Sequence, residues 1–128
     1  MDHATQAERL VRALEDAGVR DRRVLEAFRR VRRERFVPAG SEDDAGLDRP
    51  IRIGHAQVTT QPSLVGRMVE GLRLTGDERV LEVGTGFGYQ AAVLAELAPH
   101  VFTVELVSEL AEEARRRLDR LEIGRAHV

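Results

Sequence analysis

The chain has 128 residues, of which 42% are hydrophobic and 33% are charged, a composition typical of a folded globular domain and not of a disordered segment. Its formal net charge of −2 gives no general attraction to nucleic acid or acidic membranes, and all 20 basic residues are arginine. Cysteine is absent, which excludes disulfides, thiolate metal sites and cysteine nucleophiles.

The first residues of the chain contain neither the basic nor the apolar region of a signal peptide. No apolar run is long enough to cross a bilayer as a helix. We therefore expect a cytoplasmic protein.

The first third of the chain predicts helices. Thr5 and Glu8 have the spacing of a capping box, and Gly18 is suited to the left-handed position that ends a helix. Asp21 is a candidate N-cap for a second helix, which we expect to run to the Phe-Val-Pro segment at 36–38. The acidic, glycine-containing stretch that follows predicts a loop up to residue 48.

The next segment carries weaker signals. Residues 49–54 predict a short extended piece at best, and residues 53–62 predict an exposed polar loop. Proline at position 62 favours the first turn of a third helix. The residues of this helix expected to face inward are Leu64, Val65, Met68, Val69 and Leu72.

The periodicity changes after residue 76. We expect a buried strand at 79–83, a helix of small residues at 91–97, a second strand at 101–104 and a last helix at 108–121. Helices followed by a βαβα pattern predict an α/β fold in which a helical cap precedes a parallel sheet.

A glycine-rich segment lies between the first of these strands and its helix. Glycines 84, 86 and 88 let the backbone turn sharply and approach a ligand, while the helix that follows presents free amides. In the dinucleotide-binding fingerprint the third glycine comes one residue later, where this chain has Tyr89. With Glu82 two residues before the first glycine, the segment resembles motif I of the Rossmann-like methyltransferases, whose loop holds S-adenosylmethionine.

Glu105 lies at the end of the second predicted strand, 21 residues after Gly84. An acidic side chain at this place can accept hydrogen bonds from both hydroxyls of a ribose. Alone, the glycines could form a tight turn without a ligand, and Glu105 could be a solvated acid at a helix start. Together the two features predict a site for a nucleoside-type cofactor.

The segments around this motif resemble the protein-L-isoaspartate O-methyltransferase family over roughly the start of the chain to Leu121. The matching segments are Arg23–Ala27, Arg35–Pro38, Asp48–Pro50, Ile53-Gly54, Gln57, Gln61-Pro62 and Leu81–Ala92. The resemblance implies a helical cap at residues 1–55, with a linker, and the first half of a Rossmann-like S-adenosylmethionine-binding domain at residues 56–128.

The resemblance also implies a site. Thr60 stands where the family has its active-site serine, and Ala56 replaces a loop glycine of the family pattern. The residues expected to bind S-adenosyl-L-methionine are Gln57, Val58, Thr59, Glu82, Gly84, Thr85, Gly86, Gly88 and Glu105. No metal is expected, because the four histidines are scattered without ligand spacing.

The implied reaction is methyl transfer to the α-carboxylate of L-isoaspartyl residues in damaged proteins, a repair step. Its partners would be proteins or peptides that contain such residues, with no nucleic acid or membrane partner, and the full-length protein is expected to be a monomer. The family fold has further strands after Leu121, so we expect an incomplete, loosely folded and inactive form. Residues 123–128 depart from the family pattern and are expected to be a non-native tail.

The arginine-rich segment from Arg29 to Arg35 leaves a different function open. It could bind RNA or phosphate, which would make the chain a non-catalytic nucleotide- or RNA-binding module. The simpler interpretation is a solvated helix face whose partners are Glu26 and Glu34. Another class of S-adenosylmethionine-dependent methyltransferase is the remaining alternative.

Overall fold

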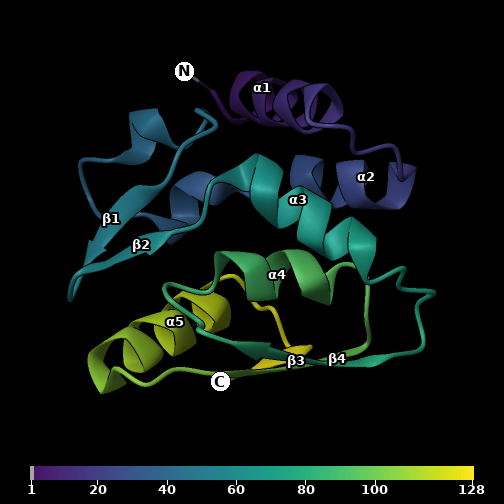
Figure 1. Ribbon diagram of the computed structural model, residues 1–128. Helices are drawn as coiled ribbons and strands as arrows, with labels where there is room; N and C mark the ends of the chain where they lie inside the picture. The colour runs from purple at the N-terminus through teal and green to yellow at the C-terminus, as the bar shows by residue number, and fades with distance from the viewer. Residues whose placement is uncertain (1) are drawn as a thin grey trace.

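The computed structural model describes residues 2–128, arranged as a helical cap above a parallel sheet (Figure 1). The expected α/β architecture is confirmed. The cap contains α1 (His3–Asp16), α2 (Arg22–Arg30) and α3 (Pro62–Gly71), with the 3-10 helices η1 (Arg33–Phe36) and η2 (Glu42–Asp44). The other elements are β1 (Ile51–Gly54), β2 (Gln57–Thr59), β3 (Arg79–Val83), α4 (Tyr89–Ala95), β4 (His100–Val104), α5 (Ser108–Arg120) and β5 (Ala126–His127).

The first two helices begin at side-chain caps. Asp21 accepts from the Arg23 amide, as expected, but α1 begins at His3, and Asp2 accepts from the Thr5 amide, so the capping box predicted at Thr5 is wrong. Gly18 has φ of 100° in the left-handed region and ends α1 as predicted. In the part of the chain that the structure describes, no helix has the length and apolar character that a membrane span requires.

Helix α2 ends at Arg30, several residues before the predicted end at 36–38. Its C-cap, Val31, leaves the helical region with ψ of 121° and buries its side chain in the core. The chain then tightens into η1, so that Phe36 is also buried. Packing of these two apolar side chains accounts for the early end, which the sequence pattern alone does not show.

The predicted polar loop at 53–62 is wrong in its first half, because β1 and β2 form an antiparallel hairpin. Ile51 pairs with Thr59, and the two turn residues His55 and Ala56 have φ of 54° and 58°. Such turns usually contain glycine or asparagine, which explains why the hairpin gives no clear sequence signal. The boundary expected between residues 55 and 56 falls in this turn, and the division into two domains stays a prediction.

The second sheet is parallel, with strand order β3-β4-β5. Arg79 of β3 pairs with His100 of β4, and Val83 pairs with Val104. The third strand lies within residues 123–128, which were expected to be a non-native tail: residues 126 and 127 pair with residues 101 and 102 of β4. This segment therefore has a place in the sheet of the described structure.

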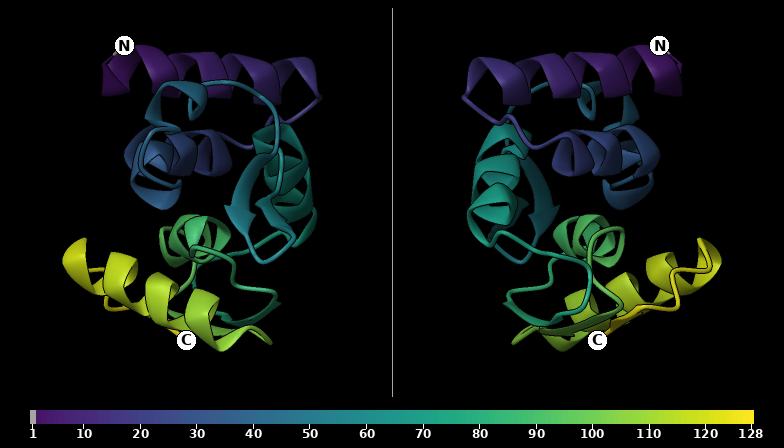
Figure 2. Two further views of the ribbon diagram at one scale, coloured as in Figure 1. Left: turned by 90° about the vertical axis from the view of Figure 1, so that its left-hand side faces the viewer. Right: turned by 90° about the vertical axis from the view of Figure 1, so that its right-hand side faces the viewer.

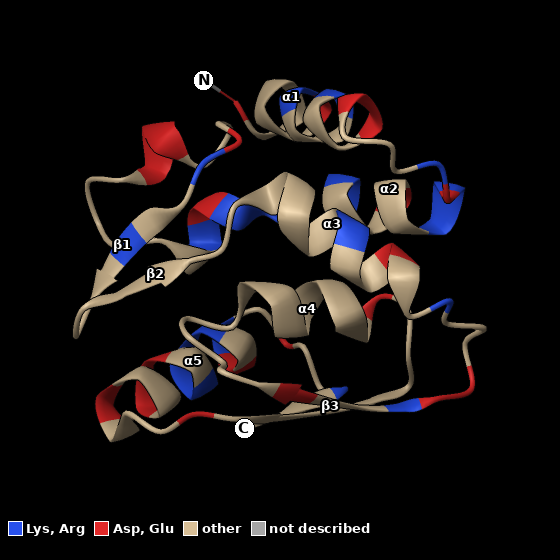
Figure 3. Cartoon of the chain, viewed as in Figure 1, with Lys and Arg blue, Asp and Glu red and all other residues tan. Residues whose placement is uncertain are grey.

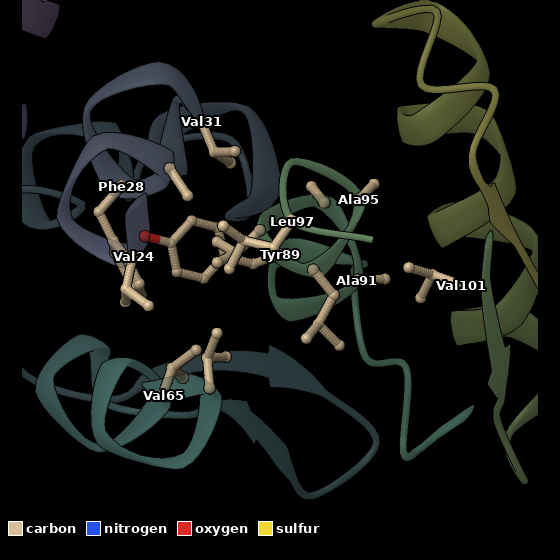
Figure 4. Close-up of a cluster of buried hydrophobic side chains, with 14 of the residues drawn as sticks. Val24, Phe28, Val31, Val65, Tyr89, Ala91, Ala95, Leu97 and Val101 are labelled. Atoms are coloured by element: carbon tan, nitrogen blue, oxygen red, sulfur yellow. The ribbon is translucent and has the colours of Figure 1, made fainter. Parts of the chain in front are cut away.

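Cap and sheet share one hydrophobic core, with α4 between them (Figures 1 and 2). Figure 4 shows Phe28 of α2, Val65 of α3 and Tyr89 of α4 close together, while Val101 of β4 approaches α4 from the other side. The ring centroids of Phe28 and Tyr89 are 6.0 Å apart in an edge-on arrangement. Aromatic pairs of this geometry add to the stability that burial provides.

Within residues 2–128 the sheet is covered on one face only. Helices α4 and α5 lie on one side of it (Figure 1), where Val101 and Thr103 are buried. On the other side Leu81 is 65% exposed and Val83 is 81% exposed. The strand at 79–83 was expected to be buried, and this expectation is therefore wrong for Leu81 and Val83.

Helix α3 also buries less of its apolar surface than predicted. Its buried positions include Val65 and Val69, but Leu64, Met68 and Leu72 are each about half exposed. Proline at its first position and its predicted start are confirmed. The apolar stripe with which α3 contacts the rest of the protein is thus narrower than the sequence pattern suggests.

Two glycines of α3 give a matched test of this packing. A Cβ at Gly66 would lie 2.6 Å from the Leu14 side chain, whereas a Cβ at Gly71 would meet nothing within 4 Å. We expect Gly66→Ala to lower the free energy of unfolding by about 1–3 kcal/mol because it overpacks the core. Gly71→Ala should leave it unchanged or raise it by up to about 1 kcal/mol. Urea unfolding of both variants measures the difference, and equal effects would contradict the packing described for Gly66.

Candidate functional site

The glycine loop between β3 and α4 is the centre of the candidate site. Gly84, Gly86 and Gly88 have φ of 94°, 57° and 99°, all in the left-handed region. A Cβ at Gly88 would contact α5 at 3.5 Å, so this glycine allows the helices to pack, whereas a Cβ at Gly84 would meet nothing within 4 Å. The Gly84 amide donates to the Val104 carbonyl at 2.8 Å, which holds the loop to the end of β4. The loop therefore presents open backbone at the carboxyl edge of the sheet.

Glu105 is held against this loop. One carboxylate oxygen accepts from the Gly86 amide at 2.8 Å, and the other accepts from the Val107 amide at 3.0 Å. Each carboxylate oxygen can accept a further hydrogen bond, so the half-buried side chain keeps capacity for two hydroxyl donors. This arrangement suits the recognition of a ribose.

Glu82 is buried below the loop. The Thr103 hydroxyl donates to its carboxylate at 2.6 Å and also shares a hydrogen bond with the Thr85 hydroxyl. Burial raises the pKa of the Glu82 carboxyl to about 7, against the lowering effect of the hydrogen bonds from Thr103 and Gln90. The carboxyl group therefore changes its charge close to neutral pH.

This shift makes stability depend on pH. Between pH 4.5 and about 7 the unfolded chain releases a proton that folded Glu82 retains, so the free energy of unfolding falls as pH rises through this window. A shift of this size corresponds to about 3 kcal/mol, which is fully expressed above pH 7. We expect Glu82→Gln to remove this loss.

Urea unfolding of the parent and the Gln variant at pH 4.5, 6 and 7.5 tests this expectation. The stability of the variant relative to the parent should rise by up to about 3 kcal/mol across the series. Other titrating groups are common to both proteins and cancel in the difference. Parallel pH profiles would show that Glu82 titrates as an ordinary carboxyl group.

Thr60 lies close to the glycine loop. It is exposed between β2 and α3 and lines a hollow of about 250 Å³ together with Glu82, Gly84 and Gly86. Its neighbour Thr59 is buried, and the Thr59 hydroxyl accepts from the Arg33 guanidinium at 2.9 Å. The Thr60 hydroxyl is thus the one of the pair that is exposed.

A second hollow of about 510 Å³ lies on the other side of the same loop. Gln57 and Val58 of the hairpin line it together with Gly84, Gly86 and Glu105. The structure therefore brings together around one loop the residues predicted from the sequence. Among them Gly88 packs against α5, and Thr59 is engaged by Arg33.

Arg33 is a residue that the sequence interpretation misplaced. It was expected on a solvated helix face, but its side chain is 1% exposed. The guanidinium donates to the carbonyls of Ala45, Leu47 and Arg49 and to Thr59, so it joins the 45–49 loop to β2. Burial lowers the pKa of Arg33 from its ordinary value.

The neighbouring arginines form ion pairs with glutamates on the surface, as the interpretation of a solvated helix face expects. Arg29 and Arg30 both pair with Glu26, and Arg32 pairs with Glu34. Figure 3 shows basic and acidic residues interspersed over α1, α2 and α5 in that view. Within the arginine-rich segment, Arg29, Arg30 and Arg32 therefore form surface ion pairs, and Arg33 is a buried structural residue.

Asp48 also has a role that the sequence interpretation missed. Its carboxylate accepts from the Ser63 amide at 2.8 Å and from the Gln61 side chain at 3.2 Å. It thus caps the first turn of α3 from a distant position in the chain. Arg33 on one side and Asp48 on the other fix the residues that flank Thr60.

Tyr89 is the residue that directly follows the third glycine. It is the first residue of α4, and its buried ring packs 5.9 Å from the Phe36 ring. Burial raises the pKa of its hydroxyl. A side chain at this position therefore anchors the glycine loop in the cap.

Among residues 2–128 no group of three or more histidine, aspartate or glutamate side chains is arranged to hold a metal ion. The site described above consists of backbone amides, hydroxyl groups and two carboxylates. Such groups suit an organic cofactor with polar substituents.

Comparisons with known proteins agree with this chemistry. The family model described as protein-L-isoaspartate(D-aspartate) O-methyltransferase matches residues 5–128. The chain is 51% identical over 111 residues to protein-L-isoaspartate O-methyltransferase 2 of Marinobacter nauticus, a match that covers 87% of the chain and 51% of that protein. It is 52% identical over 103 residues to a protein-L-isoaspartate O-methyltransferase of Myxococcus xanthus, covering 80% of the chain and 49% of the relative. The chain thus spans about half the length of the curated relatives that it matches.

Solved structures show the same fold. A protein-L-isoaspartate O-methyltransferase superposes with a TM-score of 0.82 at 29% identity, covering 94% of the chain and 40% of that protein. A beta-aspartate methyltransferase of Plasmodium falciparum, solved in complex with S-adenosyl-L-homocysteine, gives a TM-score of 0.71 at 21% identity and covers 92% of the chain and 59% of that protein.

Proposed function

Because the chain belongs to the protein-L-isoaspartate(D-aspartate) O-methyltransferase family, we propose that it supplies the S-adenosyl-L-methionine site of an enzyme that methylates L-isoaspartyl residues in damaged proteins. The observation that carries the proposal is the shared hollow between the glycine loop and Thr60. A donor held by the loop and an acceptor held by Thr60 would meet in this hollow.

The residues around the loop fit the cofactor. The Gly84 backbone is open, with space where a side chain would stand, and would support the aminoacyl part. Glu105 would accept the ribose hydroxyls with its remaining lone pairs, while Gln57 and Val58 would line the same side of the cofactor. Bound S-adenosylmethionine would supply the methyl group from a sulfonium, a good leaving group.

Thr60 would orient the acceptor carboxylate by donating a hydrogen bond from its hydroxyl. An ionised carboxylate is already a nucleophile, so the site needs no general base. The O–CH₃ bond of the methyl ester would form as the S–CH₃ bond breaks. The protein would contribute by aligning the two reactants and excluding water, which are large effects in bimolecular reactions.

We propose to test this function with a fusion. The whole 128-residue chain is joined to the part of the Marinobacter nauticus relative that follows the region shared by the two proteins, over which they are 51% identical. Transfer of radiolabelled methyl groups to an isoaspartyl peptide is expected, and the matching aspartyl peptide is the control. A folded fusion that binds neither S-adenosylhomocysteine nor the peptide would contradict the proposal.

In this fusion, Thr60→Val should slow methyl transfer by about tenfold or more, because it removes the hydroxyl that positions the acceptor. Binding of S-adenosylhomocysteine should change much less. The substitution is nearly isosteric, and Thr60 is exposed, so the fold should be retained. Steady-state turnover and calorimetric binding measure the two effects. Unaffected turnover would contradict the proposed role of Thr60 in positioning the acceptor.

The substrates proposed for this enzyme are proteins and peptides that contain L-isoaspartyl residues. A cytoplasmic location and a monomeric full-length enzyme are part of the same proposal. They follow from the sequence expectations described above.

A further inference from the structure

Three successive residues, Thr103 and Val104 of β4 and Glu105 directly after it, hold the glycine loop. Val104 accepts from the Gly84 amide at 2.8 Å, and Glu105 accepts from the Gly86 amide at 2.8 Å. Thr103, the third of them, shares a hydrogen bond with the Thr85 hydroxyl. The loop is thus attached to β4 at consecutive positions along both segments.

Thr103 is placed to connect two residues, because its hydroxyl also donates to the Glu82 carboxylate at 2.6 Å. A hydroxyl group has one proton, so when that proton goes to Glu82, the Thr85 hydroxyl must donate to Thr103. With Glu82 ionised, the three side chains therefore form a directed chain from Thr85 through Thr103 to Glu82. All three are buried, at 4%, 1% and 5% exposure.

From this arrangement we propose that Thr103 is a positioning residue for the cofactor. Its hydroxyl fixes the Thr85 side chain and thereby the loop backbone between Gly84 and Gly86. Thr103 does not line either hollow around the loop, so it acts through Thr85 and Glu82 and does not touch the ligand. The expected effect of Thr103 on cofactor binding rests on the proposed function.

A hydrogen-bonding role and a packing role of Thr103 predict different effects of substitution at this position. Valine has nearly the shape of threonine and would fill the space beside β3, but it would leave Glu82 and Thr85 without their shared partner. Serine would restore the hydroxyl although it lacks the methyl group. A residue that serves only packing would respond in the opposite way.

The experiment compares Thr103→Val and Thr103→Ser with a matched surface control. Thr75 donates from its hydroxyl to the Glu78 carboxylate at 2.8 Å on the exposed side of the chain, so Thr75→Val removes the same kind of bond away from the loop. Amide hydrogen exchange is followed in the 128-residue chain. S-adenosylhomocysteine affinity and the KM for S-adenosylmethionine are measured in the fusion.

Thr103→Val should speed exchange of the Gly84 and Gly86 amides by about tenfold and leave α1 unchanged, because a loosened loop opens locally. The affinity for S-adenosylhomocysteine should fall by about tenfold and KM for the cofactor should rise, while kcat and the KM for the peptide change little. Thr103→Ser should return both values to near those of the parent, and Thr75→Val should alter neither.

A double-mutant cycle keeps the experiment decisive even if Thr103→Val disturbs β4. Thr85→Val breaks the same relay from the loop side, and the double variant should be no worse than either single one. Parent-like exchange and affinity in Thr103→Val, or additive losses in the double variant, would overturn the inference. Failure of the parent fusion to bind S-adenosylhomocysteine would instead contradict the proposed function, and the exchange data would still decide the role of Thr103.

Discussion

Valine at position 86 should abolish binding of S-adenosylhomocysteine, with a loss of affinity of about a hundredfold or more in the fusion. Gly86 has φ of 57°, a conformation that β-branched residues strongly avoid. Even a bare Cβ would lie 3.3 Å from the Ile53 side chain, so the two methyl groups of valine would press into the hairpin or into the ligand space. The amide that Glu105 holds would move with them.

A graded series separates the effect on binding from loss of the fold. Gly86→Ala keeps a single methyl group and should weaken binding by about tenfold, since an isolated left-handed residue costs about 1–2 kcal/mol. Thermal unfolding of both variants controls for gross disruption. Affinity within a few-fold of the parent in the folded valine variant would show that the loop does not contact the cofactor.

Arg33→Met should have the largest effect on stability and lower the free energy of unfolding by about 3–5 kcal/mol. Methionine fills part of the space but leaves three carbonyls of the 45–49 loop and the Thr59 hydroxyl without the donors that Arg33 supplies. The matched control is Arg32→Met on the adjacent residue, whose side chain is 46% exposed beside Glu34. Its effect should be within about 0.5 kcal/mol.

Arg33→Lys is a third variant whose free energy of unfolding can be compared with those of Arg33→Met and Arg32→Met. Lysine keeps the charge but cannot reach four acceptors with one ammonium group, so its stability should lie between those of the parent and Arg33→Met. Urea unfolding of the three variants gives the order. Equal effects of Arg32→Met and Arg33→Met would mean that the buried network contributes nothing beyond a surface ion pair.

The elements around the glycine loop could be predicted because local signals and tertiary structure agree there. Strand β3 has the predicted bounds, since its apolar run is flanked by turn residues on both sides. The starts of α3 and α5 were also correct. The hairpin was missed because His55 and Ala56 occupy left-handed positions without the usual turn residues. A turn with left-handed residues other than glycine or asparagine cannot be recognised from the pattern of residues alone.

The residues proposed for the site lie around one loop, but the side chains that support this loop were not predicted from the sequence. Glycine spacing and the acid at the end of β4 identify the loop, because backbone freedom depends on residue type. Arg33, Asp48 and Thr103 support it through contacts with residues 12 or more positions away. A run of arginines gives no sign of which member turns inward, so tertiary contacts decide it.

The uncovered face of the sheet has a consequence for synthesis of the protein. While this stretch emerges from a ribosome, α4 and α5 close one side of β3 and β4, and Leu81, Val83 and Val104 remain open to water on the other. Exposed apolar surface beside an unpaired strand edge is what molecular chaperones recognise and what nascent chains aggregate through. The open side therefore makes this stretch prone to aggregation and to chaperone binding during its synthesis.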